Sequence, residues 1–185
     1  MGLIPVATPI DDLLCVKCDS RRDERGSFTR LFCAEALASL LGERRIVQVN
    51  QSVTRQVGAL RGLHFQHFPH AEMKLVRCIR GQVWDVVVDL RRNSSTFLCW
   101  HAERLSAENQ RMLVIPEGCA HGFQVLEEDS EMLYLHTEFY RPDAEGGVRH
   151  DDPALAIDWP LPARDLSARD QQHPLITSDF IGLAP

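Results

Sequence analysis

Two segments rich in histidine and glycine constrain the fold of this chain more than any other feature of its sequence. The first runs from Gly58 to Gly81 and carries His64 six positions after its opening glycine. The second is Ile115–Phe123, in which Gly118 precedes His121 by three positions. A Pro-Gly turn of this kind closes a hairpin and directs the following histidine back along a strand. We therefore predict that the two segments are the two halves of one site inside a β-structure.

The rest of the chain has the pattern of a β-protein, because short runs of aliphatic, β-branched and aromatic residues alternate with polar turns. Strands are predicted at Leu13–Lys17, Ser27–Phe32, Arg45–Ser52, Gly62–Gln66, Lys74–Arg80, Gln82–Asp89, Leu98–Leu105, Arg111–Pro116, Gly122–Leu126 and Glu131–Phe139. Val83–Asp89 is almost continuously apolar and is the predicted central buried strand. Helical patterns are confined to Ala34–Leu41 and the region of Ser167–Asp170. Many short strands joined by hairpins predict an all-β jelly roll with a few short helices.

Size and charge narrow the function. A chain of 185 residues with 44% hydrophobic residues can bury one sizeable core, so we expect a single domain, 1–185, whose C-terminal segment packs on the barrel. The net charge of −6 argues against a nucleic-acid partner, although local arginines still allow an anionic small ligand. The sequence has neither a membrane-length apolar run nor a signal peptide, which predicts a cytoplasmic protein with no membrane partner. Its six cysteines are expected to be free thiols.

The spacing within the two segments resembles the two motifs of the cupin family, which implies a cupin-type jelly-roll barrel. A cupin metal site needs three imidazoles and a carboxylate. Gln66 and Lys74 stand where the second histidine and the glutamate would be, and an ammonium group repels a divalent cation. We therefore interpret the pocket as metal-free and expect no cofactor. His64 can still accept a proton, and Lys74 can stabilise negative charge on an oxygen.

Strand alternation predicts which side chains of the first segment share a face. On Gly62–Gln66, His64 and Gln66 point the same way, so Gln66 faces the cavity if His64 does. By the same parity Arg61 and His67 face away, unless the strand ends or bulges nearby. A lone histidine in such a strand is more often a core residue, and it is the surrounding pattern that favours function here.

A more specific resemblance extends over nearly the whole chain in the correct order. It is carried by Asp23–Phe28, Val47–Ser52, Leu60–Gln66, Lys74–Arg77, Gly81–Arg91, Ile115–Phe123, Asp151–Pro153, Ile157–Pro160 and Leu166–Asp170. With these segments the chain resembles the dTDP-4-dehydrorhamnose 3,5-epimerase family of deoxysugar biosynthesis. The resemblance implies a metal-independent isomerase that inverts C3, C5 or both in a nucleoside-diphosphate 4-keto-6-deoxyhexose such as dTDP-4-dehydro-6-deoxy-D-glucose.

Such an inversion needs a base on one face of the sugar, an acid on the other, and a group that holds the enolate between the two steps. The resemblance implies that His64 is the base and that Asp170 orients its imidazole. It further implies that Lys74 stabilises the enolate and that Tyr134 is the acid. Without the family pattern, Asp170 would read equally well as a helix cap, Tyr134 as a core residue and Lys74 as a solvated charge.

The resemblance also implies how the substrate and a second subunit bind. Arg25 and Arg61 occupy positions that contact the pyrophosphate, which suits their planar, charged side chains. In the family the N-terminal strand crosses to a second subunit. Arg25 and Phe28 would therefore serve the pocket of a partner, and the active unit would be a homodimer.

Gln48 and Asn50 are implied as polar contacts to the nucleotide and sugar, Tyr140 as an aromatic contact to the base or sugar, and His121 as part of the cavity wall. Around them the chain departs from the usual family pattern at Arg30, Glu72, Leu135, Phe139 and His150. No catalytic group is lost. The departures leave open the exact sugar and nucleotide and whether C3, C5 or both are inverted.

Four other functions remain open on the sequence alone. A C3-only or C5-only epimerase would use the same four residues, and a 3,4-ketoisomerase would share the fold and substrate. A metal-dependent cupin would use His64, His67 and His121. A non-catalytic sugar-nucleotide-binding protein would bind the ligand without exchanging its C3 or C5 protons.

Overall fold

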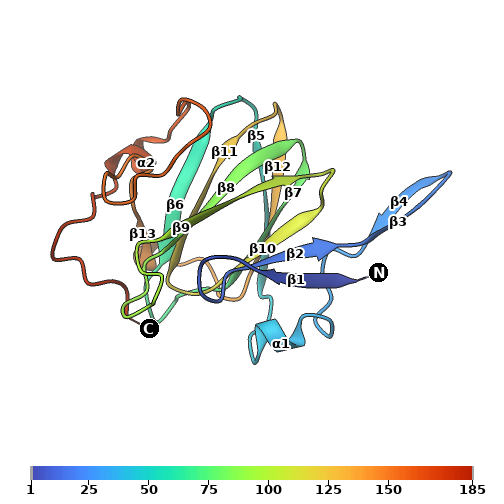
Figure 1. Ribbon diagram of the computed structural model, residues 1–185, viewed down its shortest axis with the longest axis horizontal. Helices are drawn as coiled ribbons and strands as arrows, with labels where there is room; N and C mark the ends of the chain where they lie inside the picture. Colours follow the sequence, from blue (N-terminus) through green and yellow to red (C-terminus); the bar gives the residue numbers. More distant parts are fainter. Residues whose placement is uncertain (1, 185) are drawn as a thin grey trace.

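The computed structural model describes residues 2–184 and consists mainly of two antiparallel β-sheets that face each other (Figure 1). The larger sheet contains, in spatial order, β1 (Leu3–Ala7), β2 (Leu14–Cys18), β10 (Arg111–Ile115), β7 (Lys74–Arg80), β12 (Ser130–His136) and β5 (Gln48–Thr54). The smaller contains β13 (Glu145–Gly147), β6 (Leu60–Gln66), β11 (Cys119–Val125), β8 (Gln82–Asp89) and β9 (Trp100–Ser106). Neighbouring strands in space are mostly distant in sequence, which confirms the predicted all-β jelly roll.

Side chains from the inner faces of both sheets form one core cluster between them. β8 shows how the sequence builds it, because alternate side chains of a strand point to opposite faces. Val83 and Val87 belong to this inner cluster, whereas Val86 and Val88 pack in a second cluster on the outside of the smaller sheet. All four are fully buried. Burial of one such side chain is worth roughly 1.5–3 kcal/mol, and burial on both faces explains the nearly continuous apolar run.

The chain after β13 covers the outside of the smaller sheet, as predicted. Its one helix there is α2 (Ala168–Gln172), which begins after Ser167, and the Ser167 hydroxyl accepts a hydrogen bond from the backbone N–H of Asp170 at 3.1 Å. Further on, Ile176 and Phe180 pack against the outer cluster. This segment places the short helix against β6.

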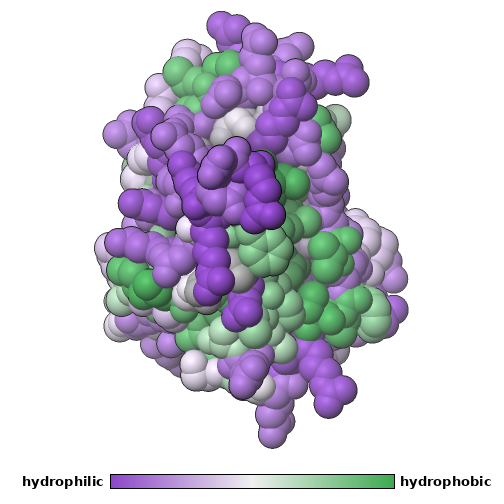
Figure 2. Space-filling view, turned by 90° about the vertical axis from the view of Figure 1, so that its right-hand side faces the viewer, coloured by the Kyte–Doolittle hydropathy of each residue, from purple (hydrophilic) through white to green (hydrophobic). Residues whose placement is uncertain are grey.

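Two elements lie outside the sandwich. The short helix α1 (Ala38–Leu41) packs Leu41 into a third cluster beneath the larger sheet. The hairpin of β3 (Ser20–Asp23) and β4 (Gly26–Thr29) projects from the body of the protein (Figure 1). Figure 2 faces this end of the molecule, where hydrophilic side chains project toward the viewer and hydrophobic side chains gather beside and below them.

A 3-10 turn (Pro142–Ala144) precedes β13. Within residues 2–184, no helix is long and apolar enough to cross a membrane.

Candidate active site

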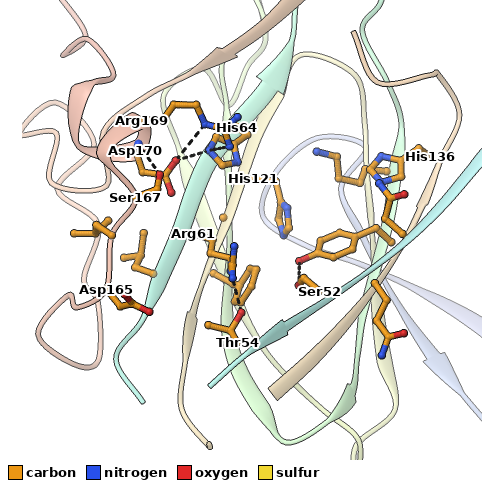
Figure 3. A pocket seen from close by; sticks show the side chains of 18 of the residues that line it. Ser52, Thr54, Arg61, His64, His121, His136, Asp165, Ser167, Arg169 and Asp170 are labelled. Atoms are coloured by element: carbon orange, nitrogen blue, oxygen red, sulfur yellow. Dashed lines mark hydrogen bonds and ion pairs between the residues drawn. The ribbon is translucent and has the colours of Figure 1, made fainter. Parts of the chain in front are cut away.

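A cavity of about 820 Å³ opens between the two sheets and is lined by both of them and by the segment around α2 (Figure 3). His64, Asp170 and Arg169 lie on one side of it, Ser52 and His136 lie on the other, and His121 lies between them. The two histidine-containing segments and the distant C-terminal segment therefore all contribute residues to one cavity.

The first group in the cavity is a hydrogen-bonded pair of His64 and Asp170. Nε2 of His64 lies 2.7 Å from Oδ1 of Asp170, and the imidazole is half-buried while the carboxylate is buried. The second oxygen of Asp170 accepts from the backbone N–H of Gly62 at 3.3 Å. A carboxylate held on both oxygens fixes the orientation of the ring. When Nε2–H donates to Asp170, the basic lone pair of the neutral imidazole lies on Nδ1.

Asp170 is held as an anion in this place. Burial acts to raise its pKa, but the hydrogen bond from His64, the charge of that ring and the N–H of Gly62 outweigh burial and lower the pKa to about 2. Asp170 lies in the first turn of α2, where its backbone N–H is capped by Ser167. The helix cap that the sequence suggested as an alternative role is therefore Ser167, and the Asp170 carboxylate is free to reach β6.

A close backbone contact places Arg61 in the cavity, against the parity expected from the sequence. Arg61 lines the cavity and its Nε donates to Thr54 Oγ1 at 2.9 Å. Simple alternation fails because the pairing of β6 with β11 shifts register between His121 and Phe123. At this shift Gly62 and Gly122 touch: an ideal Cβ on Gly122 would lie 2.6 Å from the carbonyl oxygen of Arg61. The exception noted for a bulge near Arg61 is the arrangement observed.

Gln66 follows the expected alternation, since Leu63 and Phe65 pack in the outer cluster, but it lies beyond the residues that line the cavity with His64. Its buried amide instead donates to the carbonyls of His70 and Phe139, and its oxygen accepts from the N–H of Arg141 at 2.6 Å. Gln66 thus ties two loops to the end of β6.

The second group lies on the larger sheet, on one face formed by three neighbouring strands. Tyr134 of β12 pairs in register with Asn50 of β5 and Val76 of β7, and its hydroxyl lies 2.9 Å from that of Ser52. Burial raises the pKa of the Tyr134 phenol above its ordinary value, an effect that the Ser52 hydrogen bond only partly offsets. The phenol therefore carries its proton at neutral pH.

Lys74 is part of a charged cluster on the same face. Its Nζ lies 3.0 Å from one carboxylate oxygen of Glu72, and the other oxygen lies 2.7 Å from Nδ1 of His136. All three side chains are nearly buried, with 12%, 9% and 11% exposure. Burial acts to raise the pKa of Glu72, but His136 and Lys74 outweigh it and lower the pKa below its ordinary value. Asn50 lies 3.4 Å from the other nitrogen of His136.

His121 connects the two groups across the floor of the cavity. It pairs in register with His64 on the smaller sheet, and its ring meets that of Tyr134 edge-on at 6.4 Å between centroids. Its Nε2 lies 2.9 Å from the carboxylate of Asp85, which is fully buried. Burial raises the pKa of Asp85, and the contact with His121 works against that rise. This pair fixes the His121 ring at the cavity wall.

Four of the predicted substrate-binding residues do not line the cavity. Arg25 and Phe28 are in the projecting hairpin, where Arg25 pairs with Asp23 and Phe28 is 67% exposed. Gln48 accepts a hydrogen bond from the backbone N–H of Tyr140 at 3.1 Å, and the Tyr140 hydroxyl donates to Glu145, so both residues belong to a rim outside the cavity lining.

Other residues of the site were not predicted: Ser52, Thr54, Asp85, His136, Ser167 and Arg169. Glu72 was expected near the pocket only as a departure from the family pattern, without a role. Asp85 had a usable signal, because a carboxylate within the apolar run of β8 must find a buried partner. The sequence signal at Glu72 and His136 was weaker. Their types are ordinary for loops and strand ends, and only the β7–β12 register brings them together.

The three histidines of the metal-dependent alternative do not form a ligand cluster among residues 2–184. His67 packs its ring edge-on against Phe65 at 4.9 Å, and His121 is held by Asp85. The arrangement of His64, His67 and His121 therefore gives no support to a cupin metal centre built from them.

Known proteins resemble this chain in sequence and in fold. The sequence profile of the family described as dTDP-4-dehydrorhamnose 3,5-epimerase matches residues 7–178. The Salmonella typhimurium protein of that name is 44% identical over 178 residues, which are 94% of this chain and 96% of the relative. The dTDP-6-deoxy-D-glucose-3,5-epimerase of Legionella pneumophila, solved in complex with dTDP-4-keto-L-rhamnose, superimposes with a TM-score of 0.89 at 40% identity and covers 97% of each chain. A dTDP-4-dehydrorhamnose 3-epimerase of Streptomyces niveus is 40% identical over 85% of this chain and 76% of its own.

Proposed function

The chain belongs to the dTDP-4-dehydrorhamnose 3,5-epimerase family, and from this we propose how its cavity inverts a dTDP-linked 4-keto-6-deoxyhexose. The C4 carbonyl of such a sugar acidifies the protons on C3 and C5. Removal of either proton gives an enolate, and return of a proton from the opposite face inverts the carbon. The reaction therefore requires one proton acceptor and one proton donor on opposite sides of the ring.

His64 is the proton acceptor. Its pairing with the anionic Asp170 favours the imidazolium that forms when the ring takes a proton, and it holds the ring in one orientation. Asp170 stays ionised throughout, so it acts on the orientation and charge of His64 and does not transfer the proton itself.

Tyr134 is the proton donor, and Lys74 stabilises the enolate oxygen. Burial keeps the Tyr134 phenol protonated until the enolate is present to accept its proton. The Lys74 ammonium is anchored by Glu72 and lines the same cavity, where a fixed positive charge stabilises developing negative charge without reorganisation.

The observation that carries this proposal is the placement of the two groups on opposite sheets. His64 belongs to β6 of the smaller sheet, Tyr134 belongs to β12 of the larger one, and both side chains line one cavity. A sugar ring lying between the sheets presents one face to each, which is the arrangement that inversion by two groups requires.

The nucleoside diphosphate of the substrate is bound by residues of two chains. Arg61 and Asn50 line the cavity of this chain, and His121 forms its wall. Gln48 and Tyr140 lie at the rim, in reach of a nucleotide that extends out of the cavity. Arg25 and Phe28 of a second copy complete the pyrophosphate and base contacts in a homodimer.

Two features support the homodimer. The projecting hairpin holds an aromatic side chain, Phe28, in solvent, and isolated exposure of this kind on an extended arm is typical of an exchanged element. The edge strand β5 also exposes Val49 and Val53, at 58% and 50%. Exposed apolar side chains on an edge strand are normally covered by a partner in a stable protein.

The test is proton NMR of dTDP-4-keto-6-deoxyglucose in deuterated water. Wild-type protein is expected to introduce deuterium at C3, C5 or both. His64→Ala is expected to slow the exchange by about 10²–10⁴-fold, which is the contribution of a positioned base. His67→Ala is the matched control, because that exposed histidine lies just beyond the end of the same strand and should exchange at the wild-type rate.

If His64→Ala exchanged the C3 and C5 protons at the wild-type rate, His64 would not be the base. The same spectra separate the two activities found among the relatives, since a 3-epimerase introduces deuterium at C3 alone and a 3,5-epimerase introduces it at both carbons. No exchange with wild-type protein at either carbon would overturn the proposed reaction and favour a binding protein.

A further inference from the structure

A third side chain, His173, lies against the His64–Asp170 pair and has no part in the chemistry proposed above. Its Nε2 lies 3.9 Å from Oδ1 of Asp170, the same oxygen that meets His64. The two imidazoles meet edge-on, with 5.6 Å between centroids. Nε2 of His173 is buried and has no hydrogen-bond partner among residues 2–184. A ring nitrogen that makes no other hydrogen bond can serve as a ligand, and this one lies beside a carboxylate and a second imidazole.

The His173 ring packs directly on the backbone of β13. The ring lies on Gly147 of β13, where an ideal Cβ would lie 2.4 Å from the imidazole, so only glycine leaves room for it. Gly147 pairs in register with His64 across the β13–β6 ladder. The backbone therefore sets the spacing of the two histidines, and Asp170 lies on the same short helical segment as His173.

We propose that His64, Asp170 and His173 form a binding site for a divalent transition-metal ion, with Zn²⁺ the best match to the donor set. One donor atom from each residue lies within 4.8 Å of the other two. Two imidazole nitrogens and one carboxylate oxygen are ligands that Zn²⁺ prefers, with bonds of about 2.0–2.2 Å that place tetrahedral ligands about 3.3 Å apart. The observed separations of 2.7 and 3.9 Å lie on either side of that value.

Metal binding would change the proton on His64 in a defined way. The ion takes Nε2 of His64, so the proton that Nε2 shares with Asp170 leaves and the neutral ring carries its proton on Nδ1 instead. The lone pair that accepts the substrate proton is then absent. Three protein ligands would leave the fourth position of a tetrahedral ion to a water molecule. Loading this site would inhibit the epimerase, and this consequence rests on the function proposed above, whereas the binding itself does not.

Arg169 opposes the ion and provides a test of opposite sign. Its guanidinium lies 3.4 Å from Nε2 of His64 and 3.7 Å from Asp170, so it repels a cation at the site. The side chain is 53% exposed, so it can turn toward solvent when an ion arrives, although doing so strains its 2.7 Å ion pair with Glu145. Removing this charge should strengthen metal binding, while removing His173 should weaken it.

The experiment is a titration of the protein with Co²⁺, a spectroscopic substitute for Zn²⁺, in the absence of substrate. Wild-type protein is expected to bind one ion with the visible spectrum of nitrogen and oxygen ligands. His173→Ala should weaken binding by about a hundredfold or more, since even the partners of metal ligands contribute about 10–100-fold. Arg169→Ala should bind several-fold more tightly. His67→Ala, which changes a histidine outside the cluster, should bind like wild type.

The spectrum also separates this site from the six free cysteines, because thiolate ligation adds an intense near-ultraviolet band. Equal Co²⁺ affinity in wild type and His173→Ala, or a thiolate spectrum in wild type, would overturn the site. Opposite effects of His173→Ala and Arg169→Ala cannot both come from misfolding.

A second arm tests the consequence for activity. Zn²⁺ should inhibit deuterium exchange by wild-type protein, the chelator EDTA should restore it, and His173→Ala should remain active but insensitive to Zn²⁺. Binding without inhibition would show that the ion leaves the base accessible and would overturn the inhibitory role. Protein that exchanges no proton without metal would instead count against the proposed function, while the Co²⁺ titration would still report on the site.

Discussion

Asp170 shows how one buried carboxylate links the stability of this protein to its chemistry. Its anion is held by His64 and by the backbone of Gly62, both on β6, although it lies more than a hundred residues further along the chain. Its pKa of about 2 lies below the ordinary value of 3.8. A depressed carboxyl pKa means that the folded state favours the anion, so Asp170 stabilises the fold above the ordinary pKa and loses this contribution as pH falls toward 2.

We predict that Asp170→Asn lowers the free energy of unfolding by about 2 kcal/mol at neutral pH, which is the energy equivalent of the pKa difference. The gap between wild type and variant should shrink as the pH falls from about 4 to about 2. Urea titrations at several pH values measure it. A gap that stays constant over this range would mean that the carboxylate contributes packing or hydrogen bonding without its charge.

Tyr134 separates proton exchange from inversion. In Tyr134→Phe the base remains, so His64 can still remove a proton and return deuterium to the same face. We predict that this variant still exchanges the substrate protons in deuterated water but forms the inverted sugar at least about 10²-fold more slowly, because the opposite face has no acid. Ser52→Ala is the milder control, since it removes only the 2.9 Å hydrogen bond to the phenol.

If Tyr134→Phe lost exchange and inversion to the same extent, the phenol would be acting on the first proton transfer or on substrate binding. Comparison of the NMR exchange rate with the rate of product formation therefore assigns the role of this residue directly.

At the scale of strands and helices, burial decided how well the sequence predicted the structure. β7 and β8 have the predicted bounds, Lys74–Arg80 and Gln82–Asp89, because both are central strands whose apolar residues are dictated by the core. β1, β3 and β13 were not predicted. All three strands are short, and the residues of β1 and β3 are mostly exposed. The sequences of β3 (Ser20–Asp23) and β13 (Glu145–Gly147) have no strand pattern. Pairing with a neighbour, and not local preference, makes these segments strands.

Site residues could be predicted where the sequence pattern of a single strand places the side chain. They could not be predicted where the placement depends on how two strands pair. His64, Lys74 and Tyr134 lie on well-predicted strands, and all three line the cavity. The orientation of Arg61 depends on a register shift between two strands, which alternation along one strand cannot reveal. The contact between Glu72 and His136 likewise depends on how β7 and β12 are paired.

The Gly62–Gly122 contact at that register shift is predicted to be intolerant of any side chain. A Cβ on Gly122 would lie 2.6 Å from a backbone oxygen, and a backbone atom in a sheet cannot move aside cheaply. Gly122→Ala should therefore destabilise the protein by about 1–3 kcal/mol or more. Gly147→Ala should cost less, because the nearest atoms belong to the His173 side chain, which can rotate away. Thermal unfolding of the two variants compares them, and equal losses would mean that the His173 ring is as immobile as the backbone.

On the scale of the whole molecule, the proposed homodimer implies that the projecting hairpin of one chain completes the pocket of the other. We predict that a chain with Arg25→Ala and Phe28→Ala and a chain with His64→Ala are each nearly inactive alone but recover activity when mixed. The first supplies an intact pocket and the second an intact hairpin. With full exchange about a quarter of all pockets are complete, because half of the dimers are mixed and each has one complete pocket.

Deuterium exchange measured before and after mixing tests this prediction, and native mass spectrometry verifies that the chains have exchanged. Mixed dimers without any recovery of activity would show that each pocket uses only its own chain, and Arg25 and Phe28 would then have no role in binding.

The division of the proposed base and acid between two sheets has a consequence for the product. In the proposed reaction a proton leaves the sugar on the β6 side and a proton returns on the β12 side. Loop movement does not exchange these sides, because each group is anchored in a hydrogen-bonded ladder. The face of the ring that each group addresses is therefore set by the topology of the chain. By microscopic reversibility the same two groups also catalyse the reverse inversion, with Tyr134 taking the proton and His64 returning it, so the fold fixes the two faces while the equilibrium between the sugars fixes which epimer prevails.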